Sequence, residues 1–318
     1  MNITILDDYQ DTIRTLACFG KAAGHHVTIW NDHTKDVTML AARLKDTEAL
    51  ALIRERTPIR APLLERLGKL RLISQTGVYP HLDVEACTRH GVIVSSYMAP
   101  GRPSYATAEL TWGLIIAALR RIPQEIAALR AGKWQAYPIG TGLRGKALGI
   151  YGYGRIGAVV AGYGKAFGMK VLAWGREASL TKAREDGHAV AASKEALFAE
   201  SDVLSLHLRL IDATRGLVTA ADLARMKPTA YLVNTARGPI VDEDALLEVL
   251  RQKKIAGAGI DVFSVEPLPV DHPFRKLNNM VLTPHLGYVT GDSFQNHYRQ
   301  MVEGIDAWFK GEPKQRLA

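Results

Sequence analysis

Cysteine is scarce in this 318-residue sequence, which contains only Cys18 and Cys87. Two thiols cannot form a disulfide framework, and alone they cannot complete a four-ligand structural zinc site. His207 and His285 have other expected roles, which are described below. The remaining histidines show no metal-type spacing with cysteine, aspartate or glutamate, so we expect no metal. The low cysteine content indicates a reducing compartment, and we expect a cytoplasmic protein.

Long hydrophobic runs are also missing. The longest apolar stretch, around Leu110 to Leu119, has about half of the ~20 residues that cross a bilayer. The N-terminus reaches Asp7 and Asp8 after a few apolar residues, so it resembles a first strand and not a signal peptide. We therefore expect neither a membrane partner nor an export signal.

Charge of one sign is not concentrated anywhere in the chain. Lys and Arg number 40 against 32 for Asp and Glu, which gives a formal net charge of +8. No basic run is long enough to follow a nucleic-acid backbone, so we expect no nucleic-acid partner. The thin surplus of positive charge favours small anionic ligands such as phosphates and carboxylates.

What the sequence does contain is an alternation of short β-branched runs with amphipathic segments of helical length. This alternation predicts an α/β fold of parallel sheets flanked by helices, and it occurs twice. The strands expected in the first unit are 3–6, 27–30, 49–53, 70–74 and 92–94, and those expected in the second are 148–151, 170–174, 203–207, 230–234, 257–261 and 280–283.

Two further helices fall outside this alternation. An apolar helix is expected over 106–121, between the units, and it should end before Pro123 because the residue before a proline is pushed out of the α region. A long helical pattern over 292–310 follows the last strand. Because this pattern has no strand of its own to cover, we expect it to pack on the N-terminal unit.

A dinucleotide-binding fingerprint follows the first strand of the second unit. The strand at 148–151 leads into Gly152-Tyr153-Gly154-Arg155-Ile156-Gly157 and then into a helix expected over 158–167. Gly152 permits the tight turn, Gly154 lets the backbone approach a pyrophosphate, and Gly157 lets the helix pack on the sheet. The N-terminus of the helix adds N–H donors and a partial positive charge, so the sequence predicts a nucleotide site here.

The end of the next strand bears on the choice of cofactor. NAD-binding proteins place an acidic residue there to hold the ribose hydroxyls, but this sequence has Gly175 followed by Arg176. A guanidinium pairs with a 2′-phosphate and the missing carboxylate removes repulsion, so NADP(H) is favoured over NAD(H). The alternative is that Arg176 is a solvated loop residue and that Glu177 reaches the ribose.

Three polar residues follow three later strands of the same unit. Arg237 comes just after 230–234, Glu266 comes after 257–261, and His285 comes after 280–283. The carboxyl ends of parallel strands form the ligand-facing edge of such a sheet, so these side chains are expected to converge. A 2-keto or 2-hydroxy acid needs a planar cation for its oxygens, a group that titrates near neutrality, and a carboxylate that orients that group.

The sequence resembles the D-isomer-specific 2-hydroxyacid dehydrogenases, the phosphoglycerate, glycerate and glyoxylate/hydroxypyruvate group. The resemblance covers nearly the whole chain and rests on four ordered motifs: 152–157, 234–242, 261–267 and 283–285. It implies two Rossmann-like domains, a coenzyme domain at 100–286 inserted into a substrate domain at 1–99 plus 287–318. It also implies a homodimer joined through the coenzyme domains, in which the helix at 106–121 takes part.

The resemblance also implies roles for individual residues. Arg237 would bind the substrate carboxylate and carbonyl, His285 would be the acid/base, and Glu266 would be its partner. The remaining implied contacts are backbone N–H groups of Gly77 and Val78 to the substrate carboxylate, Asp261 to the nicotinamide amide, Thr235, Ala236 and Arg237 near the nicotinamide ring, and the loop after His207 beside the adenosine.

Two residues depart from the family's usual pattern. Arg209 stands where proline is common, and it either adds a phosphate contact or points to solvent. Tyr288 replaces a small residue, and together with Tyr79 it either narrows the substrate pocket or packs at the hinge. The expected activity is hydride transfer from NADPH to a small 2-keto acid; the alternatives are a formate or phosphite dehydrogenase and a non-catalytic, corepressor-like dinucleotide sensor.

Overall fold

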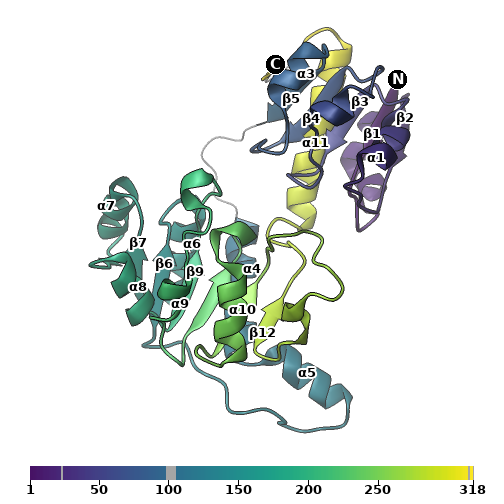
Figure 1. The fold of residues 1–318 in the computed structure, drawn as a ribbon. Coiled ribbons are helices and arrows are strands. Elements are labelled where there is room, and N and C mark those ends of the chain that lie inside the picture. The colour runs from purple at the N-terminus through teal and green to yellow at the C-terminus, as the bar shows by residue number, and fades with distance from the viewer. Residues whose placement is uncertain (23, 98–104, 314–315, 318) are drawn as a thin grey trace. The chain divides into compact units, whose positions relative to one another are not determined.

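A computed structural model of the chain describes residues 1–22, 24–97, 105–313 and 316–317. The chain divides into two compact units (Figure 1): unit 1 is Met1–Gly101 with Thr290–Ala318, and unit 2 is Arg102–Val289. The first expected boundary, between 99 and 100, lies outside the described residues. The second boundary is expected between 286 and 287, whereas the boundary between the two units of the structure lies between Val289 and Thr290.

Unit 1 is built on a five-stranded parallel sheet in the order β2-β1-β3-β4-β5. Its strands are β1 (Asn2–Ile5), β2 (His26–Ile29), β3 (Ala49–Leu52), β4 (Leu72–Thr76) and β5 (Ile93–Tyr97), and its helices are α1 (Val37–Leu44), α2 (Ala61–Leu64), α3 (Val84–Arg89) and α11 (Gly291–Phe309). The strands lie where the sequence predicts them, with ends shifted by at most three residues. β3 and β4 are buried along their whole length, as expected of central strands in a parallel sheet.

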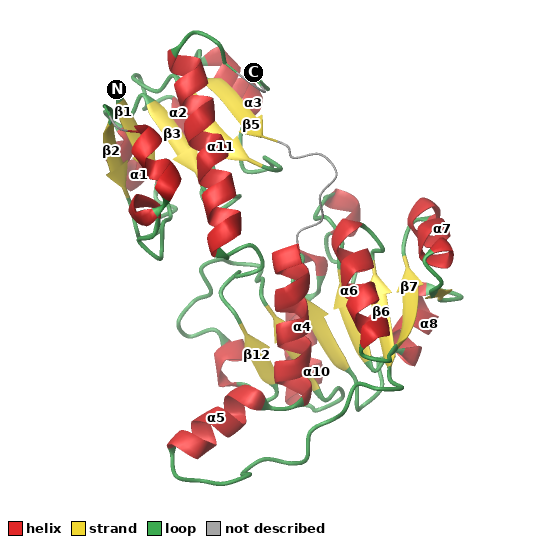
Figure 2. Ribbon diagram, turned by 180° about the vertical axis from the view of Figure 1, so that it is seen from behind, coloured by secondary structure: helices red, strands yellow, loops and turns green. Residues whose placement is uncertain are grey.

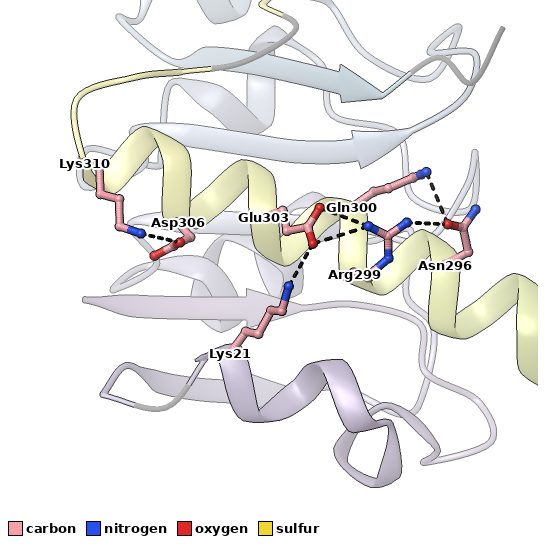
Figure 3. Close-up of polar contacts among 7 residues, drawn as sticks. All are labelled: Lys21, Asn296, Arg299, Gln300, Glu303, Asp306 and Lys310. Carbon is pink, nitrogen blue, oxygen red and sulfur yellow. Dashed lines mark hydrogen bonds and ion pairs between the residues drawn. The ribbon is translucent and has the colours of Figure 1, made fainter.

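The C-terminal helix α11 belongs to unit 1, as the sequence predicts. Its inner face is apolar and buried, and the hydroxyl of Ser74 on β4 donates to the carbonyl of Met301 over 2.9 Å. Its outer face carries ion pairs, among them Lys21 with Glu303 at 2.8 Å and Lys310 with Asp306 at 2.9 Å (Figure 3). Exposed pairs of this kind add little stability, so the apolar face is what holds the helix.

Unit 2 is built on a seven-stranded parallel sheet in the order β12-β11-β10-β9-β6-β7-β8. Its strands are β6 (Ala147–Tyr151), β7 (Lys170–Trp174), β8 (Ala189–Val190), β9 (Val203–Leu206), β10 (Tyr231–Asn234), β11 (Gly257–Ile260) and β12 (Met280–Leu282), and its helices are α4 (Tyr105–Leu119), α5 (Ile122–Arg130), α6 (Arg155–Ala166), α7 (Glu177–Glu185), α8 (Lys194–Glu200), α9 (Ala220–Leu223) and α10 (Glu243–Arg251). The α/β prediction of helix-flanked parallel sheets is confirmed for both units.

Helices cover both faces of the unit 2 sheet, as Figures 1 and 2 show from opposite sides. Trp112 of α4 and Val160 of α6 share one apolar core, whereas Phe198 of α8 and Leu250 of α10 belong to the other. Neighbouring residues of β10 feed opposite cores, because successive side chains of a strand point to opposite faces. Both faces of the sheet are therefore buried, and loops lie along the edge formed by the carboxyl ends of the strands.

Two predicted helix boundaries are wrong. The helix expected over 106–121 ends at Leu119, and a second helix, α5, begins at Ile122 with Pro123 in its first turn. The N–H groups in the first turn of a helix have no partner within the helix, so a proline, which lacks this N–H, is tolerated there. Pro123 therefore marks the start of α5 as well as a limit to the helix before it. The helix expected over 158–167 begins at Arg155, so Arg155, Ile156 and Gly157 lie in its first turn.

Cys18 and Cys87 are both free and buried in unit 1. Across the described parts of the chain, no helix combines the length and apolar character that a membrane span needs. Within the same residues, no three side chains of His, Cys, Asp or Glu gather in a way that would hold a metal ion.

Candidate active site

The glycine loop joins β6 to α6 and fits a dinucleotide. Gly152 has φ +99°, and a Cβ there would lie 2.7 Å from the carbonyl oxygen of His207. A Cβ on Gly157 would lie 2.3 Å from the carbonyl oxygen of Gly152, so only glycine lets α6 start this close to the turn. Around Gly154, the N-cap of α6, a Cβ would meet nothing within 4 Å. This open backbone at a helix N-terminus is the setting that a pyrophosphate needs.

The other residues of the fingerprint differ in what they present. Tyr153 is buried, and its hydroxyl donates to Asp186 over 2.7 Å, so it offers only its backbone to a ligand. Arg155 is exposed at the first turn of α6, and Ile156 is half-buried. The sequence motif therefore contributes backbone donors and one exposed cation to this edge of the sheet.

Gly175 and Arg176 lie beside the glycine loop. A Cβ on Gly175 would be 3.7 Å from the Cα of Gly152. Arg176 is the exposed N-cap of α7, and its carbonyl accepts a bond from Ser179. Glu177, the alternative ribose ligand, is an exposed residue that pairs with Arg184 over 2.7 Å.

His207 follows β9 and also borders the glycine loop. Its ring Nε2 lies 2.9 Å from the hydroxyl of Ser205, and burial lowers its pKa to about 4. The ring is therefore neutral at physiological pH, and its backbone carbonyl packs over Gly152. Arg209, two residues later, is exposed.

The three residues expected to carry the chemistry follow β10, β11 and β12, which are neighbours in the sheet. The Nδ1 atom of His285 lies 2.7 Å from Oε2 of Glu266, and the other carboxylate oxygen, Oε1, accepts the N–H of Phe263 over 2.9 Å. Burial alone would raise the pKa of Glu266, but the bond from His285 and the charges of His285 and Arg237 outweigh it and hold the pKa below its usual range. The structure thus brings Glu266 and His285 into contact, with Arg237 near enough to act on Glu266.

The turn that carries Arg237 is held by a residue that the sequence did not single out. The side chain of Asn234 accepts the N–H of Ala236 over 3.0 Å and donates to the carbonyl of Arg237 over 3.0 Å. Thr235 is buried and hydrogen-bonds Thr111 on α4 over 2.8 Å. An asparagine at the end of a strand signals such a turn, because its side chain bonds the backbone two and three residues on.

The loops after β10 and β11 approach each other closely at Gly238. A Cβ at that position would lie 2.1 Å from the carbonyl carbon of Phe263, which is nearer than any side chain allows. Glycine therefore permits the backbone contact that places the Arg237 loop beside the loop of Glu266.

Asp261 is fully buried and holds the loop that carries His285. Its Oδ1 accepts bonds from the hydroxyl of Thr283 and the N–H of Leu286, and its Oδ2 accepts the N–H of Gly287, over 2.6, 2.7 and 2.9 Å. Burial is the largest influence and raises the pKa of Asp261. The expected contact to the nicotinamide amide stays a prediction, whereas the bonds that hold the loop of His285 are a role of Asp261 that the sequence analysis missed.

His285 itself has a left-handed backbone, with φ +54°. This conformation is disfavoured for histidine and persists where surrounding contacts impose it, often at active sites. Here the N–H of His285 bonds the Asp261 carbonyl over 2.8 Å. Tyr288 is buried and packs edge-on against the imidazole, with ring centroids 5.8 Å apart.

The expected substrate loop belongs to unit 1. Gly77 has φ +89°, its N–H donates to the carbonyl of Tyr97 over 2.9 Å, and its own carbonyl accepts the hydroxyl of Ser96 over 2.8 Å. Among the described residues the N–H of Val78 has no acceptor, so Val78 is the donor of the pair that is open to a ligand. Tyr79 follows it and is partly exposed, at 36%.

Comparisons with known proteins identify the family of the chain. Residues 112–287 match the model of a family described as D-isomer specific 2-hydroxyacid dehydrogenase, NAD binding domain. A glyoxylate reductase from Aeropyrum pernix is 39% identical over 299 residues, which cover 91% of this chain and 88% of that protein. A hydroxypyruvate reductase from Thermotoga maritima is 36% identical over 259 residues, or 80% of this chain and 82% of that one.

A solved structure matches the whole fold. The crystal structure of a phosphoglycerate oxidoreductase from Vibrio cholerae o395 superposes with a TM-score of 0.93 at 46% identity, covering 98% of this chain and 99% of that one. The chain therefore belongs to the D-isomer specific 2-hydroxyacid dehydrogenase family, and it is an oxidoreductase with a nicotinamide dinucleotide as its cofactor.

Proposed function

We propose that the protein reduces small 2-keto acids to D-2-hydroxy acids and prefers NADPH to NADH. The observation that carries the proposal is the 2.7 Å contact between Glu266 and His285, with Arg237 close by, on the sheet that also carries the glycine loop. Relatives named glyoxylate reductase and hydroxypyruvate reductase support the substrate class. We further propose unit 1 as the substrate domain and unit 2 as the coenzyme domain, since the family match at 112–287 lies within unit 2.

The residues of unit 2 divide the reaction between them. Nδ1 of His285 faces Glu266, so Nε2 is the atom that delivers a proton to the substrate carbonyl oxygen. Glu266 fixes this orientation and stabilises the protonated imidazole. The planar guanidinium of Arg237 binds the carboxylate and polarises the carbonyl. When bound, the reduced nicotinamide supplies the hydride.

The proposed preference for NADPH rests on the end of β7. Gly175 stands where an acid would repel a 2′-phosphate, and the adjacent Arg176 is exposed beside the glycine loop. Glu177, the alternative ribose ligand, is exposed and pairs with Arg184 along α7. We therefore retain Arg176 as the phosphate ligand.

We also propose a homodimer joined through unit 2. α5 and the loop that follows it lie apart from the sheet of unit 2 (Figure 2). Large apolar side chains of this segment are exposed. Leu129 is 59% exposed, Trp134 79% and Ile139 98%. Such a surface is typical of one that a partner covers. Sedimentation equilibrium tests this: we expect twice the 34.9 kDa chain mass, and the chain mass alone would remove the dimer.

The function is tested by a substrate panel. Glyoxylate and hydroxypyruvate are each assayed by the loss of NADPH or NADH absorbance. Formate and phosphite are assayed with NADP+ or NAD+ by the appearance of the absorbance of the reduced cofactor. We expect turnover with the keto acids and a higher kcat/KM for NADPH than for NADH. Turnover with formate or phosphite alone would contradict the proposed substrate class, and no turnover with any acid would contradict the reductase itself.

We expect a reducing compartment such as the cytoplasm, in keeping with the free thiols of Cys18 and Cys87.

A further inference from the structure

The loops at the carboxyl edge of the unit 1 sheet meet around one buried aspartate. The strand order β2-β1-β3-β4-β5 has a switch point between β1 and β3, because the chain continues from β1 to one side and later adds β3 on the other. Ligands of open α/β sheets bind at such points, outside the carboxyl ends of the strands. Asp7 follows β1, residues 54–57 follow β3, and Gly77 follows β4.

Asp7 connects three of these loops. It is 2% exposed and has a left-handed backbone with φ +64°. Its Oδ1 lies 2.8 Å from Nδ1 of His33 in the loop after β2, and its Oδ2 accepts the hydroxyl of Thr57 over 2.6 Å. Its carbonyl accepts the guanidinium of Arg56. A buried carboxylate is tolerated only when it is satisfied in this way, so the contacts form one connected brace.

The brace fixes the segment after β3, whose backbone is itself strained. Arg54 has φ +57°, a conformation that arginine adopts only where its neighbours impose it. Thr57 is buried at 2% exposure, and the guanidinium of Arg56 lies over the ring of Tyr9 at 4.5 Å. The bond of Thr57 to Asp7 and the contacts of Arg56 with Asp7 and Tyr9 therefore hold residues 54–57 against the loop after β1.

The strained backbone directs the side chain of Arg54 onto the expected substrate loop. Its Nη1 lies 2.9 Å from the position that a Cβ on Gly77 would take, so the guanidinium rests on the Cα of this glycine. Burial lowers the pKa of His81 and of His297 to about 4, and the charge of Arg54 adds to the lowering in both, after that of Arg60 in the case of His81. Both imidazoles are neutral at physiological pH, so the positive charge that lies against Gly77 is that of the Arg54 guanidinium.

We infer that Asp7 is a positioning residue for substrate binding: through Thr57 and Arg56 it holds the backbone of Arg54 so that the guanidinium lies against Gly77. There the positive charge strengthens binding of the acid's carboxylate by the loop at 77–78. The inference rests on the proposed function in one respect, namely that this loop receives the substrate.

The first test separates substrate binding from turnover. Asp7→Asn removes the negative charge and offers one acceptor oxygen in place of two, so it weakens the contacts with His33 and Thr57. We expect the KM for glyoxylate to rise about tenfold, with kcat and the KM for NADPH changed less than about twofold. Asp32→Asn is the matched control, because Asp32 is an exposed carboxylate after β2 that pairs with Arg43. An unchanged KM in folded Asp7→Asn overturns the inference.

A pair of variants at Thr57 decides the question if Asp7→Asn does not fold. Thr57→Val keeps the shape and loses the hydroxyl that donates to Asp7, whereas Thr57→Ser keeps the hydroxyl. We expect Thr57→Val to raise the KM for glyoxylate as Asp7→Asn does and Thr57→Ser to behave as the wild type. Equal impairment of both would assign the effect to packing and reject the brace.

The second test does not depend on activity. Phenylglyoxal modifies accessible guanidinium groups, and mass spectrometry of peptides gives the rate at each arginine. We expect Arg54 to react several-fold faster in Asp7→Asn than in the wild type, relative to the exposed Arg184. Equal rates reject the positioning role even in an active reductase. A wild type that turns over no 2-keto acid rejects the proposed function, while the modification rates still test Asp7.

Discussion

The Nδ1 atom of His285 lies 2.7 Å from Oε2 of Glu266, and this contact determines which ring nitrogen is presented to a ligand. The two residues come from loops after different strands, β11 and β12, which are adjacent in the sheet. Without this partner, no hydrogen bond to Nδ1 would fix the tautomer of the imidazole. The pair is therefore the feature of unit 2 that most directly prepares it for proton transfer.

Loss of the imidazole should abolish proton transfer without loss of cofactor binding. His285→Gln is expected to lower kcat for glyoxylate reduction by about 10²- to 10⁴-fold, the usual contribution of general acid–base catalysis. The Kd for NADPH, measured by fluorescence titration, should stay at the wild-type value. Near-normal turnover would remove His285 from its role.

The Glu266–His285 pair should also make stability depend on pH. The pKa of Glu266 is held below its usual range, so the charged form stabilises the fold above the unfolded pKa of about 4.3. This contribution is lost as the pH falls through the lowered folded value. Denaturant unfolding of wild type and Glu266→Gln should therefore differ near neutrality and converge in acid; a constant difference would show that the glutamate is not ionised in the pair.

The shape of the cation at position 237 should matter as much as its charge. Arg237→Lys replaces a planar fork with a point charge, so kcat/KM for glyoxylate is expected to fall about 100-fold. Arg251→Lys is the control, because it makes the same substitution at the end of α10, away from the site. If Arg237→Lys retained wild-type kcat/KM, Arg237 would not be the carboxylate ligand.

The close contact of α6 with the glycine turn predicts a steric effect. Gly157→Ala places a Cβ 2.3 Å from the carbonyl oxygen of Gly152, and we expect about 1–3 kcal/mol lower unfolding free energy and weaker NADPH binding. Gly162→Ala lies in the same helix, where a Cβ meets nothing within 4 Å. It should be neutral or stabilising by up to about 1 kcal/mol. Matching melting curves for the two variants would contradict the packing argument.

Cofactor preference should respond to a single arginine. Arg176→Ala is expected to raise the Kd for NADPH about tenfold and to leave that for NADH nearly unchanged, because only NADPH carries a 2′-phosphate. Arg251→Ala removes an exposed guanidinium at the end of α10, away from the glycine loop, and serves as the control. Equal effects of Arg176→Ala on the two cofactors would assign the arginine to solvent.

Apart from the short β8, which was missed, the sequence predicted the strands and the residues that follow them because both signals are local. Arg237, Glu266 and His285 each stand just beyond a run of buried residues, and parallel strands end at one edge of a sheet. Their convergence required no knowledge of loop geometry.

What the sequence did not reveal depends on contacts between distant segments. Asp261 follows a strand in the same way as Arg237 and His285, and only the loop at 283–287 shows that its carboxylate bonds backbone. Asp7 gives no sign in the sequence of its bond to Thr57, fifty positions on. Pro123 reads equally as the end of one helix and the start of another, so α5 was missed.

The place of α11 in unit 1 has a consequence for the order of events during synthesis. Ser74 and Met301 are 227 positions apart, yet they share a hydrogen bond in the interior of unit 1. The residues of unit 2 emerge from the ribosome between them, and all of its strands are available before α11 is made. Unit 2 can therefore complete its core while the nascent first sheet still has an uncovered apolar face, which makes that face the part most in need of chaperones.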